Sequence, residues 1–466
     1  MLALKSIKLR QLERAINGRL LNNRFSHRQF RQVSTDSRTL KRGDIFFALI
    51  GNKFDGHDFK NEAIKKGASC LVVSKNIDIR GISVPVIKVD DTTKALGAFS
   101  KYFRDLDKTY PLIAVTGSSG KTTTKEIIAN ILSKNFNPKK NLGTCNNHIG
   151  VPLTILDTSR KFDICVLELG TNHFGEIAYL AEIAQPQVAV ITNIGPSHLE
   201  SFGDERGVLR EKTSLLNYLI QPRILILNND IPLLKHMKIP SNIKSFTFGI
   251  DQDSDVTADD ITIDNRGIIF RCNRNTIIRL NTQGRFNIYN ALAGILCGLI
   301  FGISISQSKS ALENFEFPAQ RLKKINIGNA YILDDTYNSN PLSLKAAIET
   351  LVEFRTSGRK ILVMGDMLEL GKNASQLHKN IGSLVGRLPI DIFITFGNFS
   401  RYAAKEAMST FGNKQQTLYY DSQDEVVNFL KNCIRDGDVL LIKGSRLLKM
   451  ENIVTSLINF FNQATK

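Results

Sequence analysis

The sequence of 466 residues contains no tryptophan and few cysteines, and its apolar runs are short. The six cysteines lie far apart with no Cys-x-x-Cys pair, which excludes a dense disulfide framework and favours buried, reduced thiols. The most apolar run, Ala291 to Ile303, is shorter than the roughly 18 residues that a membrane-spanning helix needs. The first residues lack the continuous apolar core of a signal peptide. We therefore expect a cytoplasmic protein without a membrane segment.

Positive charge is in excess, because 61 Lys and Arg stand against 44 Asp and Glu and give a formal net charge of +17. This balance suits an anionic partner such as a nucleotide, a phosphorylated metabolite, a nucleic acid or a membrane surface. The basic residues are spread along the chain, which favours a solvated basic surface and leaves nucleic acid as the second choice. An apolar fraction of 42% with 23% charged residues excludes global disorder.

Length and strand spacing predict an α/β protein of three domains. At about 150 residues per domain, the chain is long enough for roughly three. Residues 1–108 carry short apolar strands and one helical stretch, which indicates a small α/β unit. Residues 109–318 contain four apolar runs separated by helix-length segments, the spacing of a mostly parallel sheet. Residues 319–466 repeat this alternation and predict a doubly wound, Rossmann-like sheet.

The central domain also contains a segment of different character. Between Lys244 and Asn281 the sequence changes to short strands with turn signals. We interpret this segment, including the strand from Ser245 to Ile250, as an antiparallel flap. The apolar helix around Ala291 is expected to close the domain.

A glycine turn follows the first strand of the central domain, in the sequence TGSSGKTTTKE. Gly117 and Gly120 bracket the turn, and Lys121 and Thr122 begin the next helix. Backbone N–H groups of such a turn cradle phosphate oxygens, the lysine neutralises terminal phosphates, and the threonine hydroxyl suits Mg²⁺. Val115 stands where a standard P-loop has its first glycine, so the motif is a shortened G-x-x-G-K-T form. The alternative is a Gly/Ser-rich turn of purely structural purpose.

Two further side chains are expected near this turn. Glu168 ends the apolar strand DICVL, and His198 follows the strand VAVITNI by a short loop. Because the carboxyl ends of parallel strands meet at one edge of a sheet, both residues are expected at the phosphate loop. A carboxylate oxygen there would suit a hard cation. Taken alone, Glu168 can be a helix-end cap or an exposed charge, and His198 a hydrogen-bonded loop histidine.

Six motifs in order resemble the Mur ligase family, over nearly the whole chain from Val33 onwards. They are TGSSGKTTTKE, NNHIGVPLT, LELGTNHFGEI, ITNIGPSHLESFG, GRFNIYNALAG and DDTYNSNPLSLKAAI. The resemblance implies an N-terminal domain that binds a UDP-linked substrate, a central P-loop-type ATPase domain and a C-terminal domain that binds an amine. It implies a monomeric, ATP- and Mg²⁺-dependent ligase of peptidoglycan precursor synthesis. The third-domain motif points to the members that join D-alanyl-D-alanine to UDP-N-acetylmuramoyl-tripeptide through an acyl phosphate, with no nucleic-acid or membrane partner.

The resemblance also implies roles for single residues. Lys121, His198 and Lys212 would be catalytic, and Lys212 would be carbamylated. The ATP-binding residues would be Gly117, Ser118, Ser119, Gly120, Lys121, Thr122, Thr123, Asn290, Arg321 and Asp335, with Asn290 near the base. The metal ligands would be Thr122, Glu168, His198 and carbamylated Lys212. The UDP-substrate would be bound by Ser37, Arg38, Asn146 and Asn147.

Several of these residues have simpler alternatives. Ser37 and Arg38 can be a turn-capping serine and a surface arginine, and Lys212 a solvated helix lysine. His148 stands where the family pattern leads us to expect an acidic residue. The segments from Val363 to Gly371 and from Ile442 to Glu451 resemble the portion that receives the amine, without pointing to a single residue. No general base for the amine can be named.

Three other functions compete with this reading. A sister ligase adding a diamino acid is expected to carry an Asn-Pro-Arg signature in its C-terminal domain, and the sequence has none. An enzyme like folylpolyglutamate synthase would lack the Thr35–Arg38 segment, TDSR. A P-loop ATPase acting on nucleic acid would use the positive charge as its binding surface, but no patch of interleaved aromatic and basic residues stands out.

Overall fold

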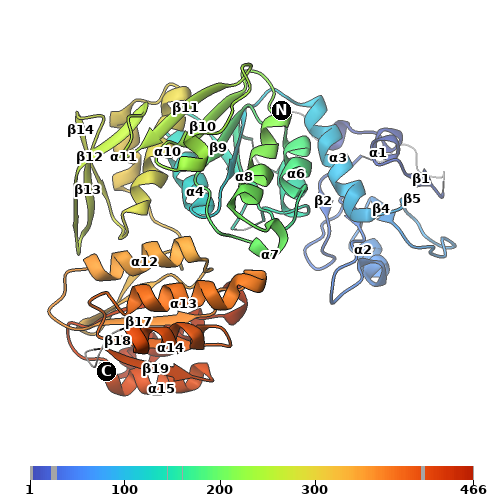
Figure 1. Cartoon of the computed structure of the whole chain (residues 1–466). Helices are drawn as coiled ribbons and strands as arrows, with labels where there is room; N and C mark the ends of the chain where they lie inside the picture. Colours follow the sequence, from blue (N-terminus) through green and yellow to red (C-terminus); the bar gives the residue numbers. More distant parts are fainter. Residues whose placement is uncertain (1–3, 23–28, 144, 160, 411–414, 465–466) are drawn as a thin grey trace.

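The computed structural model describes residues 4–22, 29–143, 145–159, 161–410 and 415–464, and they form three α/β domains in chain order (Figure 1). Each domain is built on its own sheet. The three-domain α/β architecture predicted from the sequence is therefore confirmed. We propose the boundaries 108/109 and 318/319 for the three domains. Within the described residues, no helix combines the length and the apolar character needed to cross a bilayer.

The N-terminal sheet has five short strands, of which only β1 runs antiparallel to its neighbour. Their order is β1 (Arg19–Leu20), β5 (Val86–Lys88), β4 (Cys70–Val73), β3 (Ile45–Phe47) and β2 (Val33–Ser34). The helices of this domain are α1 (Leu9–Ala15), α2 (Lys60–Lys65) and α3 (Thr92–Leu106). Asp91 caps α3 by accepting hydrogen bonds from the backbone N–H groups of Thr93 and Lys94.

The central sheet has nine strands, and seven neighbouring strands that include β6 run parallel to one another. Their order is β14 (Thr276–Leu280), β13 (Gly267–Cys272), β12 (Val256–Asp264), β11 (Lys244–Gly249), β10 (Ile224–Asn228), β9 (Val188–Ile191), β6 (Leu112–Thr116), β8 (Ile164–Glu168) and β7 (Pro138–Lys140). The helices and single turns are α4 (Lys121–Leu132), α5 (Gly150–Leu156), α6 (Glu176–Ala184), α7 (Leu199–Phe202), α8 (Glu205–Thr213), α9 (Pro232–Lys235), α10 (Phe286–Ile300) and α11 (Ile305–Glu313).

The expected flap is smaller than the sequence suggested. Strand β11, which we assigned to the antiparallel flap, pairs parallel with β10 and belongs to the core of the sheet. The antiparallel part consists of β12, β13 and β14. The crossover from β10 to β11 contains only the four-residue helix α9, so the sequence there lacks the long helical period that would indicate a parallel connection.

The C-terminal sheet is doubly wound, as predicted. Its order is β15 (Lys323–Ile327), β16 (Ala330–Asp334), β20 (Val439–Lys443), β17 (Lys360–Gly365), β18 (Ile392–Phe396) and β19 (Gln416–Tyr420), and only β15 is antiparallel to its neighbour. The helices are α12 (Pro341–Glu353), α13 (Ala374–Val385), α14 (Ser400–Thr410), α15 (Gln423–Cys433) and α16 (Glu451–Ala464). Figure 1 shows α12 and α13 on the side that faces the central domain.

Helix α3 joins the first two domains through a continuous apolar core. Its buried side chains Leu96, Phe99 and Phe103 belong to one cluster with Phe47 of the N-terminal sheet and Ile177 of α6. The third domain instead has two apolar clusters, one on each face of its sheet, and only Phe286 of the central domain packs against them. The first two domains are therefore united by apolar packing, which stabilises roughly in proportion to the area buried.

The thiol prediction holds for four of the six cysteines. All six are free, and Cys70, Cys165, Cys272 and Cys297 are buried. Burial raises the pKa of the Cys165 thiol to about 11, so this side chain stays a protonated apolar group. Cys145 is exposed, because it stands in the connection between β7 and α5 and not in an element of the core.

Candidate active site

The predicted phosphate loop connects β6 to α4 and is held rigidly by the neighbouring strand end. The Ser118 hydroxyl donates to the carbonyl oxygen of Gly195 at 2.9 Å, and the Ser119 N–H donates to the Asn193 side chain at 2.9 Å. Gly117 and Gly120 both have positive φ, at +151° and +77°. A Cβ atom on Gly120 would lie 2.5 Å from Oδ1 of Asn290, so glycine is required there.

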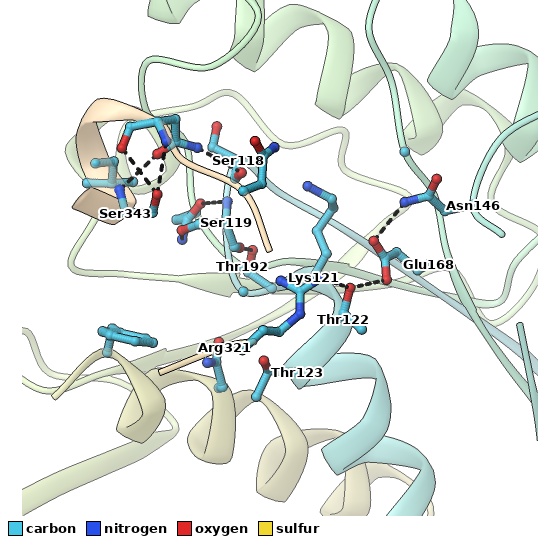
Figure 2. A pocket seen from close by; sticks show the side chains of 18 of the residues that line it. Ser118, Ser119, Lys121, Thr122, Thr123, Asn146, Glu168, Thr192, Arg321 and Ser343 are labelled. Carbon is cyan, nitrogen blue, oxygen red and sulfur yellow. Dashed lines mark hydrogen bonds between the residues drawn. The ribbon is translucent and has the colours of Figure 1, made fainter. Parts of the chain in front are cut away.

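Next to the loop, the side chains of Thr122 and Glu168 are joined by a hydrogen bond (Figure 2). The Thr122 hydroxyl donates to Oε2 of Glu168 at 2.6 Å, and Asn146 donates to Oε1 of the same carboxylate at 2.8 Å. Arg321 donates to the Thr122 oxygen at 2.8 Å. Glu168 is only 2% exposed, so its charge acts in a medium that screens it poorly. The predicted convergence of Thr122 and Glu168 is thus present in the fold.

Lys121 lies beside this pair. Its Nζ donates to the carbonyl oxygen of Gly117 at 2.9 Å. Burial lowers the pKa of Lys121, the positive charge of Arg321 lowers it further, and the negative charge of Glu168 opposes both. The ammonium is therefore poorly solvated and gains from any anion that approaches the loop.

A cavity of about 580 Å³ opens over the loop, within the usual size range of small-molecule sites. Most of the predicted site residues line it: Ser118, Ser119, Gly120, Lys121, Thr122, Thr123, Asn146, Asn147, Glu168, His198, Asn290, Arg321 and Asp335. Gly117 forms the base of the loop, and Lys212, Ser37 and Arg38 are not among the lining residues. The sequence thus identified one cavity shared by the central and third domains.

The cavity has an apolar end formed by Ile231, Phe248, Phe286 and Tyr289. Such a surface suits a flat aromatic ring. Asn290, which we expect near the base, lies against the phosphate loop, and its Oδ1 accepts a hydrogen bond from the Thr124 hydroxyl at 3.1 Å.

The third domain contributes several side chains that the sequence did not reveal. Lys443, at the end of β20, lies 2.6 Å from Asp335 and also donates to the carbonyl oxygen of Asn338 at 2.8 Å. Asn340 caps α12, and its amide donates to the Ser118 carbonyl at 3.4 Å. Lys443 follows the apolar run VLLI, so the strand-end rule that found Glu168 also applies to it.

Arg321 also contacts another residue of the third domain. Its guanidinium lies 4.1 Å from the ring centroid of Tyr337, a cation–π distance, while its Nη2 reaches Thr122. Arg321 therefore connects the junction of the second and third domains to the phosphate loop.

His198 stands at the start of α7 with a left-handed backbone, φ +50°. Its Nδ1 lies 2.6 Å from Oε2 of Glu369 in the third domain, and the backbone N–H of Glu200 donates to the carbonyl oxygen of Glu369 at 3.3 Å. Hydrogen bonding to His198 holds the pKa of Glu369 below its usual value. Glu369 was not identified from the sequence, because its partner lies in another domain.

Lys212 is buried in α8, with 2% of its surface exposed. Burial holds the pKa of Lys212 well below its usual value, and the neighbouring charge of Lys121 lowers it further while Glu211 opposes both. The surface-lysine alternative is therefore wrong. A buried amine that loses its proton easily is a nucleophile at neutral pH.

The four predicted UDP-substrate residues separate into two pairs. Asn146 and Asn147 line the cavity, and Asn147 also accepts hydrogen bonds from the N–H groups of Ile149 and Gly150. Ser37 donates to Glu62, and the exposed Arg38 pairs with Asp36 at 2.7 Å. Hydrogen bonds from Arg38 lower the pKa of Asp36 to about 2.

His148 lies at the rim of the main cavity and also lines a second cavity, of about 420 Å³, at the junction of α3 and α6. The second cavity lies between the first two domains and shares Glu176 and Tyr179 with the main one. The two cavities therefore share part of their walls.

The chain offers a partial set of metal ligands. Among the described residues, no three His, Cys, Asp or Glu side chains gather closely enough to hold a cation by themselves. Thr122 and Glu168 nevertheless present hydroxyl and carboxylate oxygens side by side at the phosphate loop. Mg²⁺ ordinarily takes one or two carboxylates and completes its octahedron with water and substrate phosphates, so this donor set fits it.

Comparisons with known proteins match almost the whole chain. The model of the Mur ligase family catalytic domain matches residues 29–104, that of the Mur ligase middle domain residues 115–298, and that of the Mur ligase glutamate ligase domain residues 320–446. A relative from Bacillus subtilis, named UDP-N-acetylmuramoyl-tripeptide–D-alanyl-D-alanine ligase, is 34% identical over 97% of this chain and 98% of its own length.

Solved structures agree in fold over the same length. MurF from Acinetobacter baumannii has a TM-score of 0.88 and 31% identity, over 98% of this chain and all of its own. MurF from Thermotoga maritima in complex with ADP has a TM-score of 0.83 and 26% identity, over 93% of this chain and 98% of its own.

Proposed function

The chain belongs to the Mur ligase family, and from this premise we propose that it joins D-alanyl-D-alanine to UDP-N-acetylmuramoyl-tripeptide in an ATP-dependent reaction of peptidoglycan precursor synthesis. The observation that carries the proposal is the meeting of the phosphate loop, Glu168 and Arg321 at one cavity, in a chain similar to such ligases over nearly its full length.

The proposed chemistry begins with transfer of the γ-phosphoryl group to the tripeptide carboxylate. The bond between the γ-phosphorus and the β,γ-bridging oxygen breaks, ADP leaves, and a carboxylate oxygen bonds to phosphorus. The backbone N–H groups of residues 117–123 would bind the phosphates, and Lys121 and Arg321 would neutralise their charge. Because such transfer depends mainly on positioning and charge neutralisation, these are the contributions the protein has to make.

Mg²⁺ bound at this site would supply positive charge that stabilises the negative charge of the phosphates during transfer. Thr122 and Glu168 would hold one ion, and His198 with carbamylated Lys212 would help to hold a second. Asn146 donates to Glu168 and so keeps that carboxylate oriented.

In the second step the amine nitrogen of D-alanyl-D-alanine attacks the acyl carbon. Inorganic phosphate leaves the tetrahedral intermediate, and the nitrogen gives up a proton as the amide forms. We propose that the third domain presents the amine, because Lys443, Asp335 and Asn338 stand on the side of the cavity opposite the phosphate loop's own domain. With the third domain packed over the loop, water has less access to the acyl phosphate.

The setting of the reaction follows from its substrates. ATP and a UDP-linked precursor are cytoplasmic metabolites, so we place the reaction in the cytoplasm. In keeping with the resemblance described above, we propose a monomer with no nucleic-acid or membrane partner.

An amine screen tests the proposal. The protein is incubated with ATP, Mg²⁺ and UDP-muramoyl tripeptide, and phosphate release is followed with D-alanyl-D-alanine, single amino acids and diamino acids. We expect release with D-alanyl-D-alanine only. Release with a diamino acid or with glutamate on a folate would favour a sister reaction, and ATPase activity stimulated by DNA at low salt would revive the nucleic-acid alternative.

Arg38 provides a second test, on the UDP-substrate side. Replacing Arg38 with alanine is expected to raise KM for the UDP-substrate about tenfold with kcat nearly unchanged, because an arginine fork contributes to diphosphate binding in ground and transition states alike. Steady-state kinetics measures both constants.

Arg80 is a matched control. It is also exposed in the N-terminal domain and pairs with the aspartate two residues before it, as Arg38 does. Arg80→Ala should leave KM unchanged. Equal effects of the two substitutions would show that Arg38 has no specific role in substrate binding.

A further inference from the structure

Two residues with strained backbones meet across the boundary between the second and third domains. His198 has φ +50° and Glu369 has φ +62°, a conformation that side-chain-bearing residues rarely adopt. The imidazole Nδ1 lies 2.6 Å from Oε2 of Glu369. Strain of this kind persists only where the surrounding structure holds it, and it gathers at functional sites.

A second contact fixes Glu369 to the same turn. The backbone N–H of Glu200 donates to the Glu369 carbonyl at 3.3 Å, so the backbone and the side chain of Glu369 both engage residues at the start of α7. Phe202 lies edge-on to the imidazole at a centroid distance of 6.2 Å and limits its rotation. The imidazole of His198 therefore contacts both the Glu369 carboxylate and the Phe202 ring.

The contact determines which imidazole nitrogen carries the proton. Nδ1 is buried and makes no well-aligned hydrogen bond, but it lies 2.6 Å from Oε2 of Glu369, a carboxylate oxygen that can accept a hydrogen bond and cannot donate one. A proton on Nδ1 satisfies this arrangement and leaves Nε2 with a free lone pair. His198 lines the same cavity as Thr122 and Glu168. Nε2 is thus the nitrogen available to a cation or a proton in that cavity.

We propose that Glu369 is a positioning residue that holds His198 in its Nδ1–H tautomer, so that packing of the third domain onto the second leaves Nε2 available to a cation or a proton in the cavity. Which of the two Nε2 binds during the reaction rests on the proposed function. Carboxylates that orient a ligating histidine in this way act through tautomer and ring orientation, and their loss typically weakens metal binding 10- to 100-fold.

The tautomer of His198 tests the proposal directly and needs no substrate. Protein labelled with ¹⁵N-histidine gives long-range ¹H–¹⁵N spectra in which the two tautomers have distinct patterns, and His198→Asn assigns the signal among the seven histidines. We expect the Nδ1–H pattern in the native protein. Glu369→Ala should shift it to the Nε2–H pattern, which free imidazole side chains prefer.

Glu369→Gln separates a tautomer role from a simple ion pair. The glutamine carbonyl oxygen still accepts a hydrogen bond from Nδ1–H but carries no charge, so this variant should keep the native tautomer. Glu200→Gln is the matched control, since Glu200 is exposed in the same turn and contacts Glu369 only through its backbone. An Nε2–H pattern in the native protein, or identical behaviour of the Gln and Ala variants, would overturn the proposal.

Cation binding gives a second readout besides activity. Mn²⁺ affinity, measured by electron paramagnetic resonance with ADP present, should fall about tenfold or more in Glu369→Ala and change less than about threefold in Glu369→Gln. Unchanged Mn²⁺ affinity in Glu369→Ala would also count against the proposal. Because the tautomer is read on the protein alone, a failure of this inference is distinguishable from a failure of the ligase assignment.

Discussion

Replacing Lys121 with alanine is expected to abolish ligation and to leave the fold intact. Lys121 begins α4 directly behind the phosphate loop, in a poorly solvated position that lowers its pKa. Its ammonium lies at the loop, where it donates to the Gly117 carbonyl, so its removal takes away one of the positive charges that would compensate a transferring phosphate in a site that screens charge weakly. We expect kcat/KM to fall about 10³-fold or more, the effect typical of losing one preorganised transition-state contact.

The fold should tolerate this change because Lys121 contributes little to packing. Its Nζ makes a hydrogen bond to the Gly117 carbonyl of its own loop, and a bond of this kind contributes about 1 kcal/mol to stability. Urea unfolding and circular dichroism measure this, and phosphate release measures turnover. Lys60→Ala is a suitable control, because Lys60 also begins a helix but lies in the N-terminal domain. Normal turnover of Lys121→Ala would refute the phosphate-loop assignment.

Replacing Lys212 with alanine is the second change with a large expected effect. Lys212 is buried, and desolvation together with the charge of Lys121 keeps its pKa well below the usual value. A neutral amine adds to CO₂ and releases one proton, which converts the side chain into a carbamate anion. Such an anion in this position would face the positive charge of Lys121 and any cation held near His198. The variant should lose most of its activity.

Chemical rescue distinguishes a carbamate from a lysine that acts as an amine. Acetate or formate can occupy the space left by the truncated side chain and restore a carboxylate, so we expect partial recovery of activity in Lys212→Ala. Full activity without added carboxylate would reject the role. In ¹³C-bicarbonate, a carbamate carbon signal should appear in the native protein and be lost in the variant.

Lys125 is a useful internal comparison for this labelling. It is as deeply buried as Lys212, but its Nζ donates to the carbonyl oxygens of Asn141 and Gly143 and lies 3.0 Å from Glu126. Its amine is occupied as a donor, so we expect no carbamate there. A carbamate signal that persists in Lys212→Ala would place the modification on another lysine.

The sequence predicted the phosphate loop because its chemistry is local. A strand, two glycines, a lysine and a threonine follow one another within eleven residues, from Leu112 to Thr122, and each has a direct physical purpose. Glu168 was found by the strand-end rule, which needs only the knowledge that parallel strands end at one edge. The burial of Lys212 did not follow from its helix, because the polar sequence around it gives no sign of the loop and helix that cover it.

Features that depend on distant partners escaped prediction. Strand β7 consists of Pro138, Lys139 and Lys140, which carry no apolar pattern, and it is a strand only because β8 pairs with it. Glu369 belongs to the site through a contact between domains. Lys443 could have been found by the rule applied to Glu168, but a lone lysine after a strand is more often a surface charge.

The unequal joining of the three domains has a consequence for how such ligases diversify. The apolar side chains of α3 belong to one core that the first two domains share, so separating these two domains would expose part of that core. The third domain keeps its apolar clusters almost wholly to itself, with Phe286 as the exception. If the third domain presents the amine, as we propose, selectivity for a new nucleophile can change there without repacking the apolar core that the first two domains share.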